Sequence, residues 1–262
     1  MPKFDPEQTI NDITRWIRDI FGHDGSKYCA VMYFTGSTTD LVIAQLIIKA
    51  IGRNSLHCLS DVARSDRVIA QSYTYDFKVK SIPSGVYVNP DISITDNDKD
   101  RRIYAYCYTY ADQNNGIVVN SKTLTERWLG LCVRGGSAGG DVAPVADITL
   151  TEVTEIAQAL HIAPTFIDDI HECIYWSRYL YDYYYQKNRS RLIDNSISHD
   201  IKFDDIDLYI RDSETAKQLL AEEVIDAIKA ARLDNIRKLQ PMLKFDYESD
   251  KMEEIKNEIS HS

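Results

Sequence analysis

The sequence predicts an α/β fold in which a single parallel β-sheet is flanked by helices. Two short segments, residues 28–33 and 117–119, are almost wholly apolar, as strands buried on both faces of a sheet are. Segments of helical length with one apolar face alternate with such strands along the chain. Elements that alternate in this way connect through right-handed crossovers into a parallel sheet. Because no linker and no internal repeat divides the 262 residues, we expect one domain over residues 1–262.

The first elements form a unit suited to binding phosphate. A helix is expected over Pro6–Phe21, where apolar residues recur every three or four positions, and the glycines at 22–25 end it. The strand at 28–33 follows, then a loop of small polar residues at 35–40 and a helix at 41–51. A strand, a small-residue loop and a helix in this order place backbone N–H groups and a helix N-terminus around a phosphate.

The remaining elements are assigned from periodicity and turn residues. We predict helices over 66–72, 99–113, 123–133 and 149–160, strands over 77–82 and 117–119, and a glycine-rich loop over 135–140. The C-terminal third is polar and helical, with an amphipathic turn at 203–210 and one or two helices at 215–243. The fold therefore carries a helical C-terminal extension, and we expect its charged tail, residues 245–262, to be frayed.

Composition narrows the class of partner. A formal net charge of −10 argues against a surface that coats nucleic acid. No stretch approaches the roughly 18 apolar residues of a membrane span, and no apolar run follows the first residues. Five cysteines without a C-x-x-C pair indicate reduced thiols, and the six histidines lack the spacing of zinc ligands. We therefore expect a cytoplasmic protein that binds a small molecule, and neither nucleic acid nor a membrane.

The central segment, from Asn97 to Val153, resembles the NAD synthetase family. The family pattern there runs N-x-K-x-R, N-N-G, G-T-x-x-x-x-E, a glycine-rich loop and then D-x-x-P-x-x-D. The matching residues in this sequence are Asn97, Lys99, Arg101, Asn114, Asn115, Gly116, Ser121, Glu126, Asp141, Pro144 and Asp147. Further on, Asp204 to Tyr209 is similar to the family's Y-x-E-I-D-x-Y-L segment. The resemblance implies a Rossmann-like fold of the N-type ATP pyrophosphatases and a homodimer. The apolar face of the first helix is compatible with such an interface, although it is equally compatible with the core.

The resemblance also implies a reaction and a set of ATP contacts. Members of the family use ATP and Mg²⁺ to adenylate the carboxylate of deamido-NAD, and ammonia then displaces AMP. A metal ion and backbone amides hold the triphosphate while charge builds on the leaving pyrophosphate. The implied ATP-binding residues are Thr35, Gly36, Ser37, Thr38, Asp40 and Ser121, and the implied magnesium ligand is Glu126. No catalytic side chain can be assigned from the sequence.

The ATP side departs from the family's S-G-G-x-D-S loop. The loop aspartate, a magnesium ligand in the family, is Thr39 here, and the second glycine is Ser37, whose Cβ hinders the approach of a phosphate. Asp40 stands one residue later, which turns it by about 100° on a helix. It fits the N-cap of the following helix as well as it fits a metal ligand. The family's ATP-contacting lysine is Leu150.

The dinucleotide side keeps its charges. The positions that contact deamido-NAD in the family are Arg101, Arg134 (a lysine in the family) and Asp141. The alternative for each is an ordinary surface charge. By resemblance, the expected ligand is deamido-NAD or NAD.

Three hypotheses therefore remain open. The chain is an ammonia-dependent NAD synthetase with an unusual phosphate loop, a catalytically impaired relative that binds a dinucleotide, or a relative that adenylates another carboxylate. The segments at 171–173 and 232–238 do not match the parts that close over ATP in the family. A tyrosine cluster over residues 175–185 either packs against protein or stacks on a ligand ring.

Overall fold

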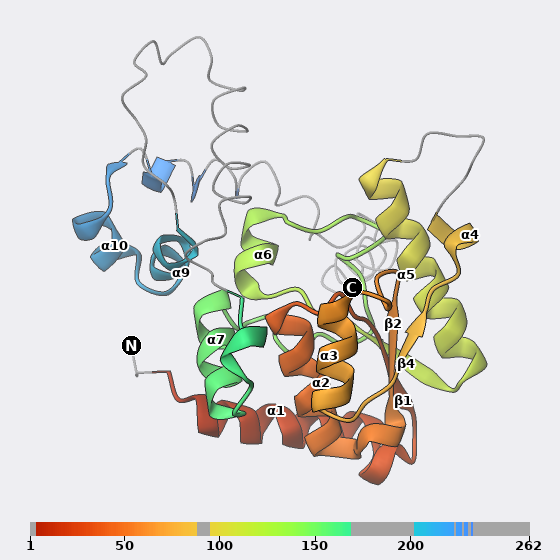
Figure 1. Ribbon diagram of the computed structural model, residues 1–262. Helices are drawn as coiled ribbons and strands as arrows, with labels where there is room; N and C mark the ends of the chain where they lie inside the picture. The colour runs from red at the N-terminus through yellow and green to blue at the C-terminus, as the bar shows by residue number, and fades with distance from the viewer. Residues whose placement is uncertain are drawn as a thin grey trace, which may run out of the picture.

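The computed structural model describes residues 4–87, 95–168, 202–222, 224–226, 228–229 and 232 (Figure 1). Four sequence-based predictions lie outside these residues. They concern the segment at 171–173, the tyrosine cluster at 175–185, the end of the last predicted helix and the frayed tail. The extent of the single domain over residues 1–262 also stays a prediction.

A four-stranded parallel sheet forms the centre of the molecule, with strand order β3-β2-β1-β4. Its strands are β1 Cys29–Tyr33, β2 Leu56–Ser60, β3 Val79–Ser81 and β4 Gly116–Val119. β1 is central, because Ala30 pairs with Leu56 on one side and with Ile117 on the other. The predicted α/β fold with a parallel sheet is confirmed, and the carboxyl ends of all four strands lie at one edge.

One face of the sheet is covered by α1 Pro6–Phe21, α2 Thr38–Ile51, α3 Asp66–Thr74 and α7 Leu150–Ala159, which share one hydrophobic core. In α1, Ile17 and Phe21 are buried in this core and Ile13 and Ile20 pack against it, whereas Trp16 is 40% exposed. The apolar face of the first helix therefore packs within its own chain. The homodimer that the resemblance implies stays a prediction.

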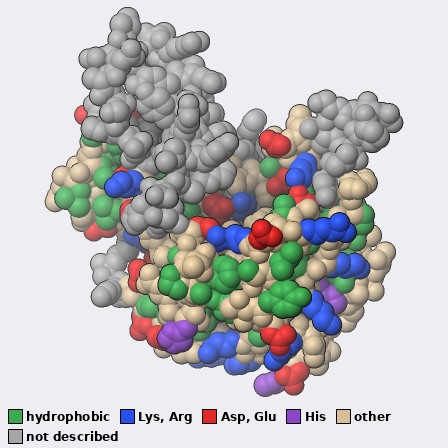
Figure 2. Space-filling model, in the orientation of Figure 1, with side chains coloured by type: hydrophobic (Ala, Val, Ile, Leu, Met, Phe, Trp, Pro, Cys, Tyr) green, Lys and Arg blue, Asp and Glu red, His purple; other side chains and the backbone are tan. Residues whose placement is uncertain are grey.

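The opposite face is covered by α5 Asp96–Gln113, with the short α4 Ser84–Tyr87 beside it. Ile103 and Cys107 of α5 pack against Val31 of β1. Ala30 and Met32, on either side of Val31, join the core of the first face, because successive side chains of a strand point to opposite faces. On the face drawn in Figure 2, acidic and basic side chains are interspersed rather than separated into two regions.

The C-terminal extension packs against neighbouring helices. α9 Phe203–Arg211 lies beside α6 Leu124–Leu129, and α10 Ser213–Leu219 packs on α9 (Figure 1). Leu129, Phe203 and Ile206 are the buried centre of a separate core cluster. Arg211 joins α9 to α7, since its Nε and Nη2 donate to the carboxylate of Glu152 at 2.8 and 2.5 Å. The predicted helical extension is confirmed.

The strand β2 is absent from the sequence-based assignment. Its five residues include His57 and Ser60, so no continuous apolar run marks it, although Leu56, Cys58, Leu59 and Ser60 are buried. Helix starts also differ: α2 begins at Thr38 and α5 at Asp96, each three residues before the predicted start. Serine or threonine N-caps, which periodicity does not detect, set both starts.

Two further elements are shorter than predicted: β3 covers only 79–81, and α6 ends at Leu129 because Gly130 adopts a left-handed conformation. Within the described part of the chain, no helix is both long and apolar enough to cross a membrane.

Candidate functional site

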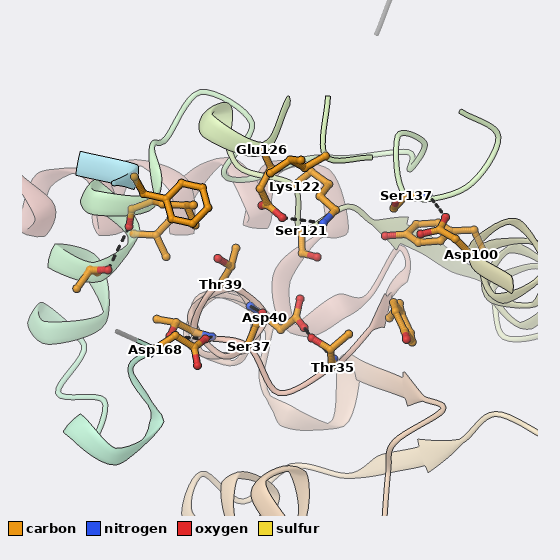
Figure 3. Close-up of a pocket in the computed structure, with 18 residues that line it drawn as sticks. Thr35, Ser37, Thr39, Asp40, Asp100, Ser121, Lys122, Glu126, Ser137 and Asp168 are labelled. Carbon is orange, nitrogen blue, oxygen red and sulfur yellow. Dashed lines mark hydrogen bonds and ion pairs between the residues drawn. The ribbon is translucent and has the colours of Figure 1, made fainter. Parts of the chain in front are cut away.

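A cavity of about 290 Å³ lies where β1 and β4 end (Figure 3). The loop after β1 and the segment after β4 line it, together with residues from α5, α7 and α9. Of the residues predicted to bind ATP or magnesium, those that line the cavity are Thr35, Ser37, Thr38, Asp40, Ser121 and Glu126. Gly36 is turned toward α3, because its carbonyl accepts hydrogen bonds from Arg67 Nε and Gln71 Nε2. The structure thus gathers nearly all of the predicted ATP-side residues at one cavity.

Asp40 faces the cavity. Its Oδ2 accepts hydrogen bonds from the backbone N–H of Thr35 at 2.8 Å and from the Thr35 hydroxyl at 2.6 Å. The N-cap of α2 is Ser37, whose Oγ accepts from Asp40 N at 3.1 Å. Burial raises the pKa of the Asp40 carboxyl, while hydrogen bonds from Thr35 and Ser121 oppose the rise. The prediction of Asp40 as N-cap is therefore wrong, and so is the expectation that it turns away from this site, because the helix begins earlier than expected.

The two departures from the family pattern also lie in the cavity wall. Thr39 and Leu150 both line the cavity, so a hydroxyl and an apolar side chain stand where an aspartate and a lysine were expected. Leu150 packs against the core cluster of the C-terminal extension. Leu150 and Val153 give the α7 wall two apolar side chains, and Thr154 of the same helix also lines the cavity.

Glu126 is held by donors on both carboxylate oxygens. Its Oε2 accepts from the backbone N–H and the hydroxyl of Thr123, each at 3.0 Å, in the capping box that starts α6. Its Oε1 accepts from Lys122 Nζ at 2.6 Å. Burial opposes the charge of Lys122, but the negative charges of Glu126 and Asp40 outweigh burial and raise the pKa of the lysine. Sequence reasoning missed Lys122, although its position four residues before Glu126 on a predicted helix start was a usable signal.

These residues do not fit a magnesium site. Mg²⁺ requires near-octahedral oxygen coordination at about 2.0–2.1 Å. Among the described residues, no group of three or more His, Cys, Asp and Glu side chains could hold a metal ion. Glu126 already accepts hydrogen bonds on both oxygens, and one donor is a cation. To act as the predicted magnesium ligand, Glu126 would have to exchange the Lys122 ammonium for the ion.

The predicted dinucleotide contacts gather beside the cavity. Arg101 Nε donates to the backbone carbonyl of Arg134 at 3.1 Å, which brings both arginines together. Their neighbours Asp100 and Ser137 line the cavity and are joined by a hydrogen bond from Ser137 N to Asp100 Oδ1 at 2.6 Å.

Asp141 is the third predicted dinucleotide contact, and it lies against β4. Its Oδ2 accepts from Val118 N at 2.8 Å. Arg101, Arg134 and Asp141 are not among the described residues that line the cavity.

A buried carboxylate next to the cavity was missed by sequence reasoning. Asp61, whose side chain is 3% exposed, accepts from Tyr33 Oη at 2.6 Å and pairs with Lys99 Nζ at 2.7 Å. Burial alone would raise the pKa of Asp61, but the hydrogen bonds from Lys99 and Tyr33 outweigh it and lower this pKa. Tyr33 lines the cavity and Lys99 belongs to the N-x-K-x-R match, so this triad fixes α5 to the carboxyl ends of β1 and β2.

Replacing Asp61 by asparagine is expected to cost about 1–3 kcal/mol of unfolding free energy at pH 7. Because the folded pKa is depressed, the carboxylate's contribution is present above its unfolded value of about 3.9 and is lost as the pH falls through the folded pKa. The difference in unfolding free energy between wild type and variant should therefore become smaller below about pH 4. Urea unfolding across this range measures it. The same substitution at exposed Asp112 on α5 is the control, and a gap independent of pH would contradict the assignment.

The fold and the site together define the class. A parallel sheet with a ligand-sized cavity at the carboxyl ends of its strands, bordered by a strand–loop–helix unit, is the arrangement of Rossmann-like α/β proteins. The NAD synthase family model matches residues 9–170, which is more than half of the chain, and the chain belongs to this family. The NH(3)-dependent NAD(+) synthetase of Finegoldia magna is 25% identical over 170 residues, which are 60% of this chain and 70% of that protein.

Solved structures agree on the fold. The NMN synthetase from Francisella tularensis superposes with a TM-score of 0.69 at 16% identity, covering 94% of this chain and 100% of that one. The NH3-dependent NAD synthetase from Campylobacter jejuni, in complex with the nitrate ion, also gives 0.69, at 13% identity over 93% of this chain and 100% of that one. These similarities extend into the C-terminal region, beyond the segment that the family model matches.

Proposed function

We propose that this protein binds a dinucleotide of the NAD type, deamido-NAD or NAD, at this cavity and does not use ATP to amidate it. The observation that carries the proposal is a carboxylate of the chain at the N-terminus of α2. Asp168 Oδ2 accepts from the backbone N–H of Thr38 at 2.8 Å and lies 3.0 Å from the Thr38 hydroxyl oxygen. In Figure 3, Asp168 stands beside Ser37 at the start of this helix.

An anion already occupies the position where a phosphate would bind. The N-terminus of a helix favours a negative charge through its free N–H groups and its dipole. Arg67 holds the carboxylate there, because its Nη2 donates to Asp168 Oδ1 at 2.7 Å and to the Phe166 carbonyl at 2.9 Å. A triphosphate at the same place would bring like charges together and would have to displace Asp168.

The dinucleotide side bears on the first half of the proposal, the binding of a dinucleotide. The Arg101 guanidinium donates to the backbone carbonyl of Arg134 beside the cavity, and neither residue lines the cavity wall. The cavity volume of about 290 Å³ lies just below the range of about 300–1,000 Å³ that is typical of small-ligand sites. The relative from Finegoldia magna carries the name of an NAD(+) synthetase, so a ligand of this class fits the family.

Calorimetric titration tests the function directly. Deamido-NAD, NAD, NMN and Mg-ATP are titrated separately into the purified protein, and the substrates are then mixed with ammonia to detect AMP. We expect saturable binding of a dinucleotide, no saturable binding of Mg-ATP and no AMP. Ammonia-dependent AMP formation would overturn the proposal and establish the amidating ligase instead.

Removing the negative charge of Asp168 is expected to make the N-terminus of α2 available to a phosphate group. Asp168→Asn keeps the size of the side chain but removes its charge, so the affinity for inorganic pyrophosphate should rise about tenfold, or about 1.4 kcal/mol. Titration calorimetry without added metal measures the change. The control is Asp147→Asn, at an exposed loop position, which should leave the affinity unchanged. Equal affinities in wild type and Asp168→Asn would show that this carboxylate does not compete with phosphate.

A further inference from the structure

A cationic side chain of the protein, Lys122, lines the cavity. The side chain of Lys122 is 23% exposed and that of Glu126 is 17% exposed, so their ion pair is largely withdrawn from water. Asp40 carries the second carboxylate of this wall, and Figure 3 shows it on the far side of Ser121 from the lysine. The Lys122 ammonium therefore pairs with Glu126 in a cavity wall that also carries Asp40.

We propose that the Lys122 ammonium takes the place of a divalent cation, so that this cavity binds its anionic ligand without metal. A metal ion coordinated by Glu126 Oε1 would lie about 2 Å from that oxygen, and the ammonium nitrogen is 2.6 Å from the same oxygen. The ion and the lysine would then be neighbouring like charges in a partly buried site. Glu126 Oε1 is therefore a poor ligand for a metal ion while Lys122 is paired with it.

Lys122 can also contact a ligand directly. An ammonium group has three N–H donors, and Glu126 Oε1 uses one of those of Lys122, so the group retains hydrogen-bonding capacity on its cavity side. Lysine binds phosphate as a point charge, without the fixed geometry that a metal ion imposes. The ligand class is therefore a phosphorylated compound recognised as its metal-free anion.

An ordinary surface ion pair does not account for this arrangement. Exposed pairs four residues apart on a helix contribute little and leave both side chains in water. Here Glu126 is fixed by the Thr123 capping box before it meets the lysine, and both side chains line a cavity. The pair is positioned by the start of α6 rather than by chance contact.

Titration of the ligand-free protein with Mn²⁺ tests whether Lys122 prevents a metal ion from binding to Glu126. Electron paramagnetic resonance measures free Mn²⁺ during titration of wild type, Lys122→Ala and Lys122→Arg. We expect no saturable site in wild type or Lys122→Arg, and one site in Lys122→Ala with at least about tenfold tighter binding. A tight single site in wild type that disappears in Glu126→Gln would overturn the proposal, as would no gain in a folded Lys122→Ala. If Lys122→Ala does not fold, Lys122→Met, which keeps the buried stem, replaces it and is judged by the same criterion.

The ligand half of the inference rests on the proposed function and has a separate readout. NAD and deamido-NAD are titrated into wild type with EDTA and with millimolar Mg²⁺. Equal affinities are expected in both buffers, with a loss of about tenfold or more in Lys122→Met. A dinucleotide that binds only with Mg²⁺ overturns the inference. If neither dinucleotide binds in either buffer, the proposed function fails, while the manganese result still decides whether Lys122 excludes a metal ion.

Discussion

Replacing Phe34 by alanine is expected to lower the free energy of unfolding by about 3–5 kcal/mol. Phe34 follows β1, is fully buried and packs edge-to-face on Phe77, with ring centroids 5.3 Å apart. Alanine leaves a cavity in the main core that neighbours cannot fill completely, and it also removes the aromatic contact. Urea unfolding followed by circular dichroism measures the loss.

The same substitution should disturb the functional site, because Phe34 directly precedes the loop at 35–37 that leads into α2. Its backbone N–H donates to the Leu59 carbonyl at 2.8 Å, so the residue also anchors the loop to β2. Tyr73→Ala is the control, since Tyr73 is 83% exposed and its loss should change stability by less than about 0.5 kcal/mol. A Phe34→Ala variant as stable as Tyr73→Ala would contradict the packing described for this core.

Asp207→Ala is expected to cost about 2–4 kcal/mol and to loosen the C-terminal extension. Asp207 is 3% exposed and accepts from the Thr151 backbone N–H at 2.8 Å, from the Thr151 hydroxyl at 2.9 Å and from the Thr125 hydroxyl. It therefore joins α9 to the starts of α6 and α7, which carry Glu126 and Leu150. Alanine leaves three donors without this acceptor in a buried site.

The Asp207→Asn variant distinguishes the stability that comes from the acceptor oxygen from the stability that comes from the negative charge. Burial raises the pKa of the Asp207 carboxyl, so its ionised form is less favourable in the fold than in water. Asp207→Asn keeps one acceptor oxygen and should retain more than half of the stability that alanine removes. Asp226→Ala, in an exposed pair with Lys229, is the control and should have little effect. If asparagine and alanine are equally harmful, the carboxylate's charge rather than its hydrogen bonding holds the extension.

Under the proposed function, two charged side chains of the chain stand where a magnesium–triphosphate complex would otherwise be expected. Asp168 supplies a negative charge at the N-terminus of α2, and Lys122 supplies a positive charge beside Glu126. Both groups belong to the chain, so a bound Mg-ATP would have to displace two existing interactions. A ligand that binds alongside these contacts, rather than in place of them, fits the cavity better.

The sequence by itself determined the elements whose signals are local. The apolar periodicity of α1 and the glycines after it marked its extent, and the apolar run of β1 and the small-residue loop after it identified the strand–loop–helix unit. The resemblance to the NAD synthetase family rested on short motifs and was confirmed by the family match. The motifs also marked Thr39 and Leu150 as departures, and both residues line the cavity. Such features depend on neighbours within a few residues, so the sequence contains them directly.

Only the tertiary structure decided which side chains meet. Asp168 reaches Thr38 across 130 residues, and Asp207 reaches Thr125 across 82, because helix packing rather than chain proximity brings them together. The direction of Asp40 depended on where α2 begins, which its Ser37 cap fixes. The strand β2 owes its place to pairing with β1, since its own residues lack a clear strand pattern. Burial and charge pairing act through space, and for that reason the contacts among the side chains of the cavity wall could not be deduced from motif spacing.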